Sequence, residues 1–484
     1  MPMRILVCTN VYPPRFVGGA ELVAHEVARN MALLGHTVAV FAGDLNGPGA
    51  HHGVTVDELD GLTVYRLTTL PADYDADNCN YIHPDIDAQF AAILREFQPT
   101  IVHAHNLIGL SVRMLITAAE SGARVFTTLH DFWGFCLRHT LLRKDGSPCG
   151  DHSGCAACLN SQTDVRAALH LRNDVMRLAF DHVEGLIAPS RHVADAYLAA
   201  GFASDRLTVL PNGIDLAHYR HAENAGSRPG GEAVVLLYAG YFGAHKGLLV
   251  LLQAMAMMDH REAVVLDLVG DGPLDAGLRA FARQQGLADR VRFRGKVDPA
   301  AMATVYAASD VFVLPSVWPE NQPVCLMEAM ASAKPVIASR IGGIPEMLED
   351  GREGLLVQPD DATALAQALD RLACDRDLRT RMGQAGRQKV AGYGYREQAQ
   401  AMLALFAGPV QPQWRAQPSR PIIALRGGHL PGRRALDDNP GYVIPLAWLS
   451  PLQLQRASTP LRLGTGAWLA MRKLARRARA WITP

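Results

Sequence analysis

The stretch at residues 318–328 (WPENQPVCLME) combines a helix-starting proline with two carboxylates. Pro323 is expected at the first helical position, because the missing N–H of proline would have no partner there. Residues 321–326 should then offer free backbone N–H groups at a positive helix end, which suits a phosphate. Glu320 precedes this end and Glu328 lies in the second turn. Sugar hydroxyls could donate to both carboxylates, so the stretch is typical of a sugar diphosphate site; the alternative is an ordinary strand–loop–helix unit with two solvated acids.

Other loops that follow expected strands carry residues suited to the same chemistry. Gly18 and Gly19 follow the first strand, and a glycine pair lets the backbone approach a ligand closely. Lys246 is expected to open a helix, where the dipole disfavours a cation unless an anion is bound nearby. A solvated lysine is the alternative. His130 ends a strand, a position where histidine is more often structural than catalytic.

Short apolar runs alternate with helical patterns along both halves of the chain, which predicts α/β domains with parallel sheets. Strands are expected at 4–9, 37–41, 62–67, 101–104, 125–129, 185–188, 207–210, 233–239, 264–269, 291–293, 311–314 and 335–338. Helices are expected at 84–97, 107–119, 165–182, 248–258, 274–285, 299–308, 324–332, 362–373, 378–390 and 396–406. Ligands of such sheets bind beyond the carboxyl ends of the strands.

The length of 484 residues suggests two domains of ordinary size and a further segment. We expect two doubly wound, Rossmann-like domains that face each other across a cleft. The expected parts are a first domain at 1–215, a linker at 216–232, a second domain at 233–394, a helix at 395–408 and a basic tail at 409–484.

The composition is that of a soluble globular protein, with 49% apolar and 19% charged residues. The formal net charge of zero conceals an asymmetry, because residues 409–484 carry a net charge of +10 and the remainder a net charge of −10. This balance argues against nucleic-acid binding by the main body. No apolar run approaches the ~18–20 residues of a membrane span, and no secretory signal is recognisable. We therefore expect a cytoplasmic protein with reduced cysteines.

Seven motifs, in register along the chain, together resemble the family 4 retaining glycosyltransferases. They are Pro13-Pro14 with Gly18-Gly19-Ala-Glu21, His130-Asp131, Pro211-Asn-Gly-Ile-Asp215, His245-Lys246-Gly247, Gly270-Asp-Gly-Pro273, Glu320 with Glu328, and Gly342-Gly-Ile-Pro-Glu346. The resemblance covers roughly the first 405 residues and implies the GT-B fold, in which two Rossmann-like domains face each other. It implies that residues 1–215 form the acceptor-side domain, that residues 233–394 form the nucleotide-sugar donor domain, and that the helix at 395–408 crosses back to the first domain.

The resemblance also implies a role for each group in the donor site. Glu328 would accept hydrogen bonds from the ribose of a nucleotide sugar, and Glu320 would face the donor sugar. Lys246 would hold the diphosphate, and His130 would lie near the departing phosphate. The implied catalytic residues are Glu320, His130 and Lys246. The implied donor-binding residues are Gly18, Gly19, Asn212, Tyr241, Lys246, Val297, Asn321, Gln322, Pro323, Val324 and Glu328.

One position departs from the family pattern. The family usually has arginine where this chain has Tyr241. Lys246 would then carry more of the diphosphate charge, or another cation such as Arg15 or Arg340 would help.

The implied reaction moves a sugar from a UDP- or GDP-sugar to a glycan or lipid-linked acceptor. Lys246, backbone amides and the glycine loop can stabilise the leaving diphosphate, so we expect no catalytic cofactor or metal. Retention is expected by front-face attack, in which the departing phosphate takes the acceptor's proton, and domain closure would limit hydrolysis. A nucleotide-sugar epimerase of the same fold and a noncatalytic relative are the alternatives.

A cysteine cluster lies outside this scheme. Four of the eight cysteines fall within 23 residues, at Cys136, Cys149, Cys155 and Cys158. The spacing of Cys155 and Cys158 is that of zinc ligands, which predicts a structural zinc. Reduced thiols or a disulfide are the alternatives.

The basic tail predicts a membrane contact. Residues 467–482 place Trp468, Met471 and Leu474 on one helical stripe and several basic residues on the rest. A basic amphipathic helix with tryptophan is typical of an interfacial anchor, so we expect docking on the anionic inner face of the cell membrane. The alternative is that the stripe packs on the acidic body of the enzyme.

Overall fold

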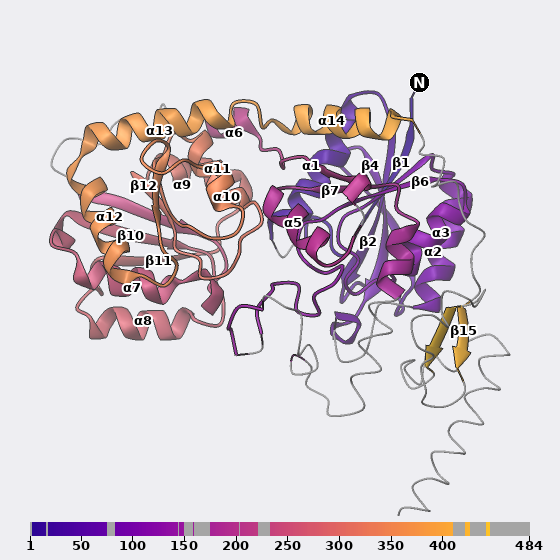
Figure 1. The fold of residues 1–484 in the computed structure, drawn as a ribbon, viewed down its shortest axis with the longest axis horizontal. Helices are drawn as coiled ribbons and strands as arrows, with labels where there is room; N and C mark the ends of the chain where they lie inside the picture. The colour runs from indigo at the N-terminus through magenta and orange to yellow at the C-terminus, as the bar shows by residue number, and fades with distance from the viewer. Residues whose placement is uncertain are drawn as a thin grey trace, which may run out of the picture.

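The computed structural model describes most of the chain up to residue 409. The described residues are 2–15, 18–74, 83–143, 145–149, 158, 175–202, 204–220 and 233–409, with the backbone of two short strands at 422–425 and 442–445. Two parallel sheets lie side by side in this part of the chain, each with helices on its faces (Figure 1). The α/β class predicted from the sequence is therefore confirmed.

The first sheet has eight strands in the order β3-β4-β2-β1-β5-β6-β7-β8. They are β1 (Arg4–Thr9), β2 (Thr37–Leu45), β3 (Val54–Leu59), β4 (Leu62–Thr69), β5 (Ile101–Ala104), β6 (Arg124–Thr128), β7 (Gly185–Ala188) and β8 (Leu207–Val209). All pairs are parallel except β3 with β4. Alternate side chains of a strand point to opposite faces, so Ile5 and Val7 join one apolar core and Leu6 and Cys8 the other. Cores on both faces explain why the central strands, such as β1 with its five buried residues after Arg4, are largely apolar.

The second sheet has six parallel strands in the order β11-β10-β9-β12-β13-β14. They are β9 (Val234–Ala239), β10 (Val264–Val269), β11 (Val291–Gly295), β12 (Val311–Leu314), β13 (Val336–Ser339) and β14 (Gly354–Val357). Their side chains pack into one continuous apolar core with the surrounding helices.

The helices follow the strands in alternation. They are α1 (Gly19–Leu33), α2 (Pro84–Phe97), α3 (Arg113–Glu120), α5 (Arg191–Ala199), α6 (Leu216–Arg220), α7 (Leu248–Met257), α8 (Asp275–Gln284), α9 (Met302–Ala307), α10 (Val324–Ala331), α11 (Ile344–Met347), α12 (Ala362–Cys374), α13 (Arg376–Val390) and α14 (Tyr395–Ala407). Short 3-10 turns are η1 (Pro71–Tyr74), η4 (Ser204–Arg206), η6 (Ala244–Lys246), η7 (Arg261–Ala263) and η8 (Pro299–Ala301). Residues 175–181 are also helical.

The last helix returns to the first domain. α14 lies over the N-terminal sheet beside α1, whereas α13 lies over the C-terminal sheet (Figure 1). Met402 and Phe406 of α14 are buried with Val23 and Val27 of α1 in the same apolar core. The chain therefore crosses between the domains a second time after leaving the C-terminal sheet.

Several element boundaries differ from the sequence expectations. The helix expected at 107–119 begins only at Arg113, because Gly109 adopts a positive φ of 77° and the Asn106 side chain accepts a bond from the Ile108 amide. The expected linker begins with α6, because Tyr219 is buried against the ring of Tyr306. The sequence did not predict β3 or β14.

α10 begins at Val324, as the expected helix at 324–332 does, but Pro323 does not occupy its first helical position. Pro323 is the cap rather than the first helical residue, with ψ at 118°. Its carbonyl accepts from the Leu326 amide at 3.1 Å, which is the bonding typical of a cap residue. The Leu326 amide is therefore used within the helix and is not one of the free N–H groups expected there.

Two features of the C-terminal segment complete the fold. β15 (Ile422–Leu425) and β16 (Tyr442–Pro445) form a parallel pair. Among the described residues no helix has the length and apolar character that a membrane span requires. The helix expected at 467–482 lies outside the described residues.

Candidate active site

Lys246 and Glu320 lie where the strand order of the C-terminal sheet reverses. β9 and β12 are neighbours, but the chain passes outward through β10 and β11 before it returns to β12. Lys246 follows β9 and Glu320 follows β12. Ligands of open α/β sheets bind at such a reversal, beyond the carboxyl ends of the strands.

The N-terminal sheet has the same reversal between β1 and β5. Gly18 and Gly19 follow β1, His105 follows β5, and His130 follows the next strand, β6. The two groups of loops therefore occupy the corresponding positions of the two domains.

An ion pair forms the centre of the C-terminal group. Lys246 Nζ lies 2.7 Å from Glu320 Oε1, and Ser316 Oγ donates to the same oxygen at 2.6 Å. Lys246 Nζ also lies 4.7 Å from the centre of the Trp318 ring. Burial alone would raise the pKa of Glu320, which is 5% exposed, but the Lys246 ammonium and the Ser316 hydroxyl outweigh it and the pKa is lowered. The site therefore holds a carboxylate and an ammonium together at neutral pH.

Lys246 reaches this position from a turn and not from the start of a helix, which corrects the sequence expectation. It ends η6, and Gly247 at a φ of +69° separates it from α7. A Cβ on Gly247 would lie 1.9 Å from the Pro315 carbonyl oxygen, and the Val317 amide donates to the His245 carbonyl at 2.9 Å. This close approach of the loops after β9 and β12 brings the two charged side chains together.

Glu328 lies one turn into α10 and is partly buried. Its Oε2 accepts from the hydroxyl of Tyr306 at 2.7 Å. Burial raises the pKa of Glu328, although hydrogen bonds from Tyr306 and Tyr219 act in the opposite direction. Both tyrosines are far from Glu328 in sequence, so the motif alone did not indicate them.

The loop before α10 contacts the N-terminal domain. The Asn321 side chain donates to the carbonyl of His130, and Gln322 Oε1 accepts from the Asn212 amide at 2.6 Å. A Cβ on Gly19 would lie 2.8 Å from Val324 Cγ2. These contacts place the loops after β1, β6 and β12 against one another. Asn321 and Gln322 thus use their side chains to hold the other domain.

Gly18 fulfils a different function from Gly19. It caps α1 with extended backbone, and its amide donates to Glu21 Oε2 at 2.9 Å. Gly18 therefore caps the start of α1, and Gly19 makes the close contact with α10. Its expected approach to a diphosphate remains a prediction.

Three histidines stack at the ends of β5 and β6. His105 Nδ1 lies 2.7 Å from His130 Nε2, and His103 Nε2 lies 2.8 Å from Thr128 Oγ1. Burial lowers the pKa of His130 to about 4 and that of His103 to about 3, and it lowers the pKa of His105 as well. The cluster is therefore uncharged at neutral pH.

Asp131, next to His130, is held by two donors. The Trp133 amide donates to its Oδ1 at 2.7 Å and Asn106 Nδ2 to its Oδ2 at 2.9 Å. Burial nevertheless raises the pKa of Asp131 to about 7. Asn106 was not predicted as part of the site, although it follows an expected strand.

The remaining expected donor residues lie at the edge of the site. Tyr241 is 51% exposed, and its ring centre lies 6.1 Å from that of His245. Val297 follows β11 and packs partly buried on the C-terminal core. Both positions follow strands of the same sheet, as the sequence predicted.

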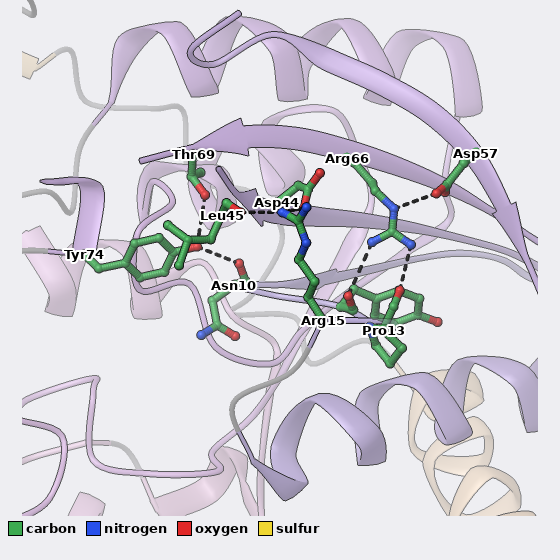
Figure 2. A network of polar contacts seen from close by, with 10 residues as sticks. Asn10, Pro13, Arg15, Asp44, Leu45, Asp57, Arg66, Thr69 and Tyr74 are labelled. Atoms are coloured by element: carbon green, nitrogen blue, oxygen red, sulfur yellow. Dashed lines mark hydrogen bonds and ion pairs between the residues drawn. The ribbon is translucent and has the colours of Figure 1, made fainter. Parts of the chain in front are cut away.

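The two helper cations that the sequence suggested are paired elsewhere. Figure 2 shows Arg15 between the carboxylate of Asp44, at 2.7 Å, and the carbonyl of Leu45. Arg340 pairs with Asp350 at 2.7 Å in the C-terminal domain. Lys246 is therefore the cation that the fold brings to Glu320.

A further contact between the domains involves Glu346. Its two carboxylate oxygens accept from the amides of Arg191 and His192, both at 2.7 Å. These amides begin α5 of the N-terminal domain, where a negative charge is favourable. The last motif of the sequence thus supplies a bridge between domains, which its spacing did not reveal.

The zinc ligands predicted from the cysteines are only partly described. Cys155 lies outside the described residues, whereas Cys136 is buried and Cys149 and Cys158 are partly exposed free thiols. The zinc site remains a prediction.

Comparison with known proteins supports the two-domain fold described above. Structures with the same arrangement of domains include sucrose-phosphate synthase from Thermosynechococcus elongatus, with a TM-score of 0.64 and 23% identity over 83% of this chain and 98% of that one. Another is Anabaena Alr3699/HepE in complex with UDP-glucose, with a TM-score of 0.60 and 20% identity over 84% of this chain and 99% of that one. The fold is accordingly the GT-B fold of glycosyltransferases.

The sequence comparison defines the family. Residues 17–218 match Glycosyltransferase Family 4, and residues 233–375 match Glycosyl transferases group 1. D-inositol 3-phosphate glycosyltransferase of Streptomyces avermitilis is 33% identical over 423 residues, which are 81% of this chain and 84% of the relative. The chain belongs to family 4 of the glycosyltransferases.

Proposed function

We propose that this glycosyltransferase moves a hexose from a nucleoside diphosphate sugar to a hydroxyl acceptor with retention of configuration and without a catalytic metal. The observation that carries the proposal is the Lys246–Glu320 pair at the strand-order reversal, beside the start of α10. The pair offers an ammonium to a diphosphate and a carboxylate to sugar hydroxyls within one site.

The leaving group requires stabilisation of a developing negative charge. Lys246 carries a positive charge, and the amides at the start of α10 add the positive end of a helix dipole. We propose that the diphosphate lies between these groups and the loop at Gly18 and Gly19. The ribose would then lie toward Glu328, whose substitution by glutamine should weaken donor binding more than turnover.

Retention is proposed to occur by front-face attack. Double displacement would need a carboxylate free to attack the sugar carbon. Oε1 of Glu320 is bound by Lys246 and Ser316, and these bonds lower its nucleophilicity. The departing phosphate would instead take the proton of the acceptor hydroxyl, while His130 and Glu320 position the sugar.

The similar proteins support a choice of donors and acceptors to test. Alr3699/HepE binds UDP-glucose, so we propose a UDP-sugar as the first donor to test, with GDP-sugars second. The Streptomyces relative is named for D-inositol 3-phosphate, so a phosphorylated polyol joins glycans and lipid-linked sugars as candidate acceptors.

The test is acceptor-dependent nucleotide release. Purified full-length protein is incubated with UDP-glucose, UDP-N-acetylglucosamine or GDP-mannose, with and without each acceptor, in the presence of EDTA. Release only with an acceptor, and a product with the donor's anomeric configuration by NMR, would support the proposal. A changed nucleotide sugar without any acceptor would indicate an epimerase, and no turnover with any donor would favour a noncatalytic relative.

A further inference from the structure

Two consecutive histidines and an aspartate meet in the N-terminal domain, in the connections that follow β2 and β4. His51 and His52 lie between β2 and β3, and Asp73 lies in η1 after β4. His51 Nε2 is 2.8 Å from Asp73 Oδ2, and His52 Nε2 is 3.4 Å from Asp73 Oδ1. One ligand atom from each residue lies within 4.8 Å of the other two.

The backbone holds this cluster firmly. The His52 amide donates to the Thr68 carbonyl at 2.9 Å, and the Thr68 amide donates to the Gly53 carbonyl at 2.9 Å. Leu70 N donates to Asp73 Oδ2 at 2.8 Å, so the carboxylate is fixed at the end of β4. His52 is 6% exposed and Asp73 5% exposed. The His52 and Asp73 side chains therefore have little freedom to rearrange, whereas His51 is partly exposed.

His52 faces a carboxylate on each side of its ring. Nε2 faces Asp73, and Nδ1 lies 3.5 Å from Asp85 Oδ2. A neutral imidazole has one N–H to offer and a lone pair on the other nitrogen. Whichever nitrogen carries the N–H, the other nitrogen faces a carboxylate, and a second proton or a metal cation on that nitrogen satisfies the contact. Metal-bound histidines typically donate their other N–H to a carboxylate, which is the position of Asp85.

We propose that His51, His52 and Asp73 bind a divalent cation of the zinc class, with both Nε2 atoms and the carboxylate as ligands and Asp85 orienting His52. Two imidazoles and one carboxylate suit zinc and not magnesium or calcium. Ligands of tetrahedral zinc lie about 3.3 Å apart at bond lengths of about 2.0–2.1 Å, close to the 3.4 Å between His52 Nε2 and Asp73 Oδ1. His51 is partly exposed, so a water can complete the coordination.

The cation would act as a structural link. It would join the β2–β3 connection to η1, whose Tyr74 hydroxyl donates to the Asn10 carbonyl at the end of β1 (Figure 2). Binding should therefore stabilise the N-terminal domain, while the donor-site pair of the C-terminal domain keeps its geometry. Metal that binds only the native state raises the unfolding midpoint.

The test uses full-length protein in which serine replaces all four cysteines of the other candidate zinc site, Cys136, Cys149, Cys155 and Cys158. After EDTA treatment and dialysis, zinc binding is measured by calorimetry and the unfolding midpoint by thermal scanning. We expect one equivalent of zinc and a rise of the midpoint. Cobalt in the same protein should show ligand-field bands without thiolate charge transfer.

The variants identify the ligands. Asp73→Asn and His51→Asn should weaken zinc binding at least about tenfold, and His51→Asn, at a partly exposed position, should still fold. His260→Asn is the matched control, because His260 Nδ1 lies 3.3 Å from Asp370 in the C-terminal domain without a second histidine. Absence of zinc binding by the cysteine variant, or unchanged binding in folded His51→Asn, would overturn the proposal.

Discussion

At the scale of single residues, the central feature of the site is the ion pair between Lys246 and Glu320. Lys246 compensates a buried carboxylate and lies over the Trp318 ring. Such a lysine can both stabilise the fold and bind a diphosphate, so substitutions there must separate the two effects.

Lys246→Ala tests this pair. We expect the turnover number to fall by roughly 10²–10³, because a charge that stabilises the leaving group is lost. Stability should fall as well, since Glu320 keeps its burial and loses its partner. Steady-state kinetics and thermal unfolding of the same preparation separate the two effects.

Lys389→Ala is the matched control for that variant. Lys389 Nζ lies 3.5 Å from the buried carboxylate of Glu353 in the same domain. Its loss should reduce stability while the folded enzyme keeps its turnover number. Equal turnover in the two lysine variants would contradict the assignment of Lys246.

At the scale of elements, the ends of β5 and β6 gather groups whose protonation changes between the folded and unfolded states. His103, His105 and His130 have lowered pKa values, and Asp131 has a raised one. All four shifts arise mainly from burial in the strand-end cluster, which places them in one acid-sensitive region.

The stability of the N-terminal domain should fall as pH decreases from about 6.5 to about 4. The unfolded histidines take up protons below about 6.5, whereas folded His130 resists protonation down to about 4 and His103 down to about 3. Each proton that the unfolded state binds and the folded state does not lowers the free energy of unfolding by about 1.4 kcal/mol per pH unit. Asp131 offsets the effect of one histidine, because the Asp131 carboxyl group keeps its proton in the folded state up to about pH 7.

Thermal unfolding between pH 7 and pH 5 measures this dependence. His103→Gln should reduce the slope of the unfolding free energy against pH by the contribution of about one proton. The unfolding midpoint of this variant at pH 7 also reports the packing that is lost. His260→Gln, at an exposed histidine of the other domain, serves as the control. A slope that His103→Gln leaves unchanged would show that the cluster does not cause the acid sensitivity.

At the scale of the whole molecule, several contacts connect the domains around the site. Asn321, Gln322 and Glu346 reach the N-terminal domain, and α14 crosses back to pack on α1. Glu346 is the charged one, and it binds two amides at the start of α5. The proposed exclusion of water from the reaction would depend on these contacts.

Glu346→Ala should therefore shift the molecule toward an open form. Loss of a carboxylate at a helix start costs about 1 kcal/mol, or roughly fivefold in an equilibrium. We expect a larger radius of gyration by X-ray scattering and a several-fold lower kcat/KM. Glu349→Ala, an exposed acid of the same domain, should change neither quantity, and a compact Glu346→Ala with full activity would refute the bridging role.

The charge of the tail predicts membrane docking. Residues 409–484 carry +10 against −10 on the rest of the chain, and each basic residue near an anionic surface contributes about 1 kcal/mol. Full-length protein should sediment with phosphatidylserine vesicles at low salt, whereas a 1–408 truncation should remain in solution. Equal sedimentation of the two would indicate that the tail does not bind the vesicles.

The sequence by itself determined the elements with strong local signals. Mainly apolar runs placed β5, β7, β10 and β12 to the residue, and Pro84 with its following apolar stripe placed α2. The exposed strand β3 was not predicted, because its polar residues give no apolar run and its position depends on pairing with β4. Local patterns also located the motif residues at strand ends, where the family resemblance assigned them.

Only the tertiary structure decided which of these residues meet. Lys246 reaches Glu320 across 74 residues, because β12 returns to lie beside β9, and His105 reaches His130 because β5 and β6 are neighbours. The tertiary structure likewise brings Glu346 to the start of α5, and His51 and His52 to Asp73. Strand order and close loop approaches arise from packing between distant segments, and no periodicity within a single segment encodes them.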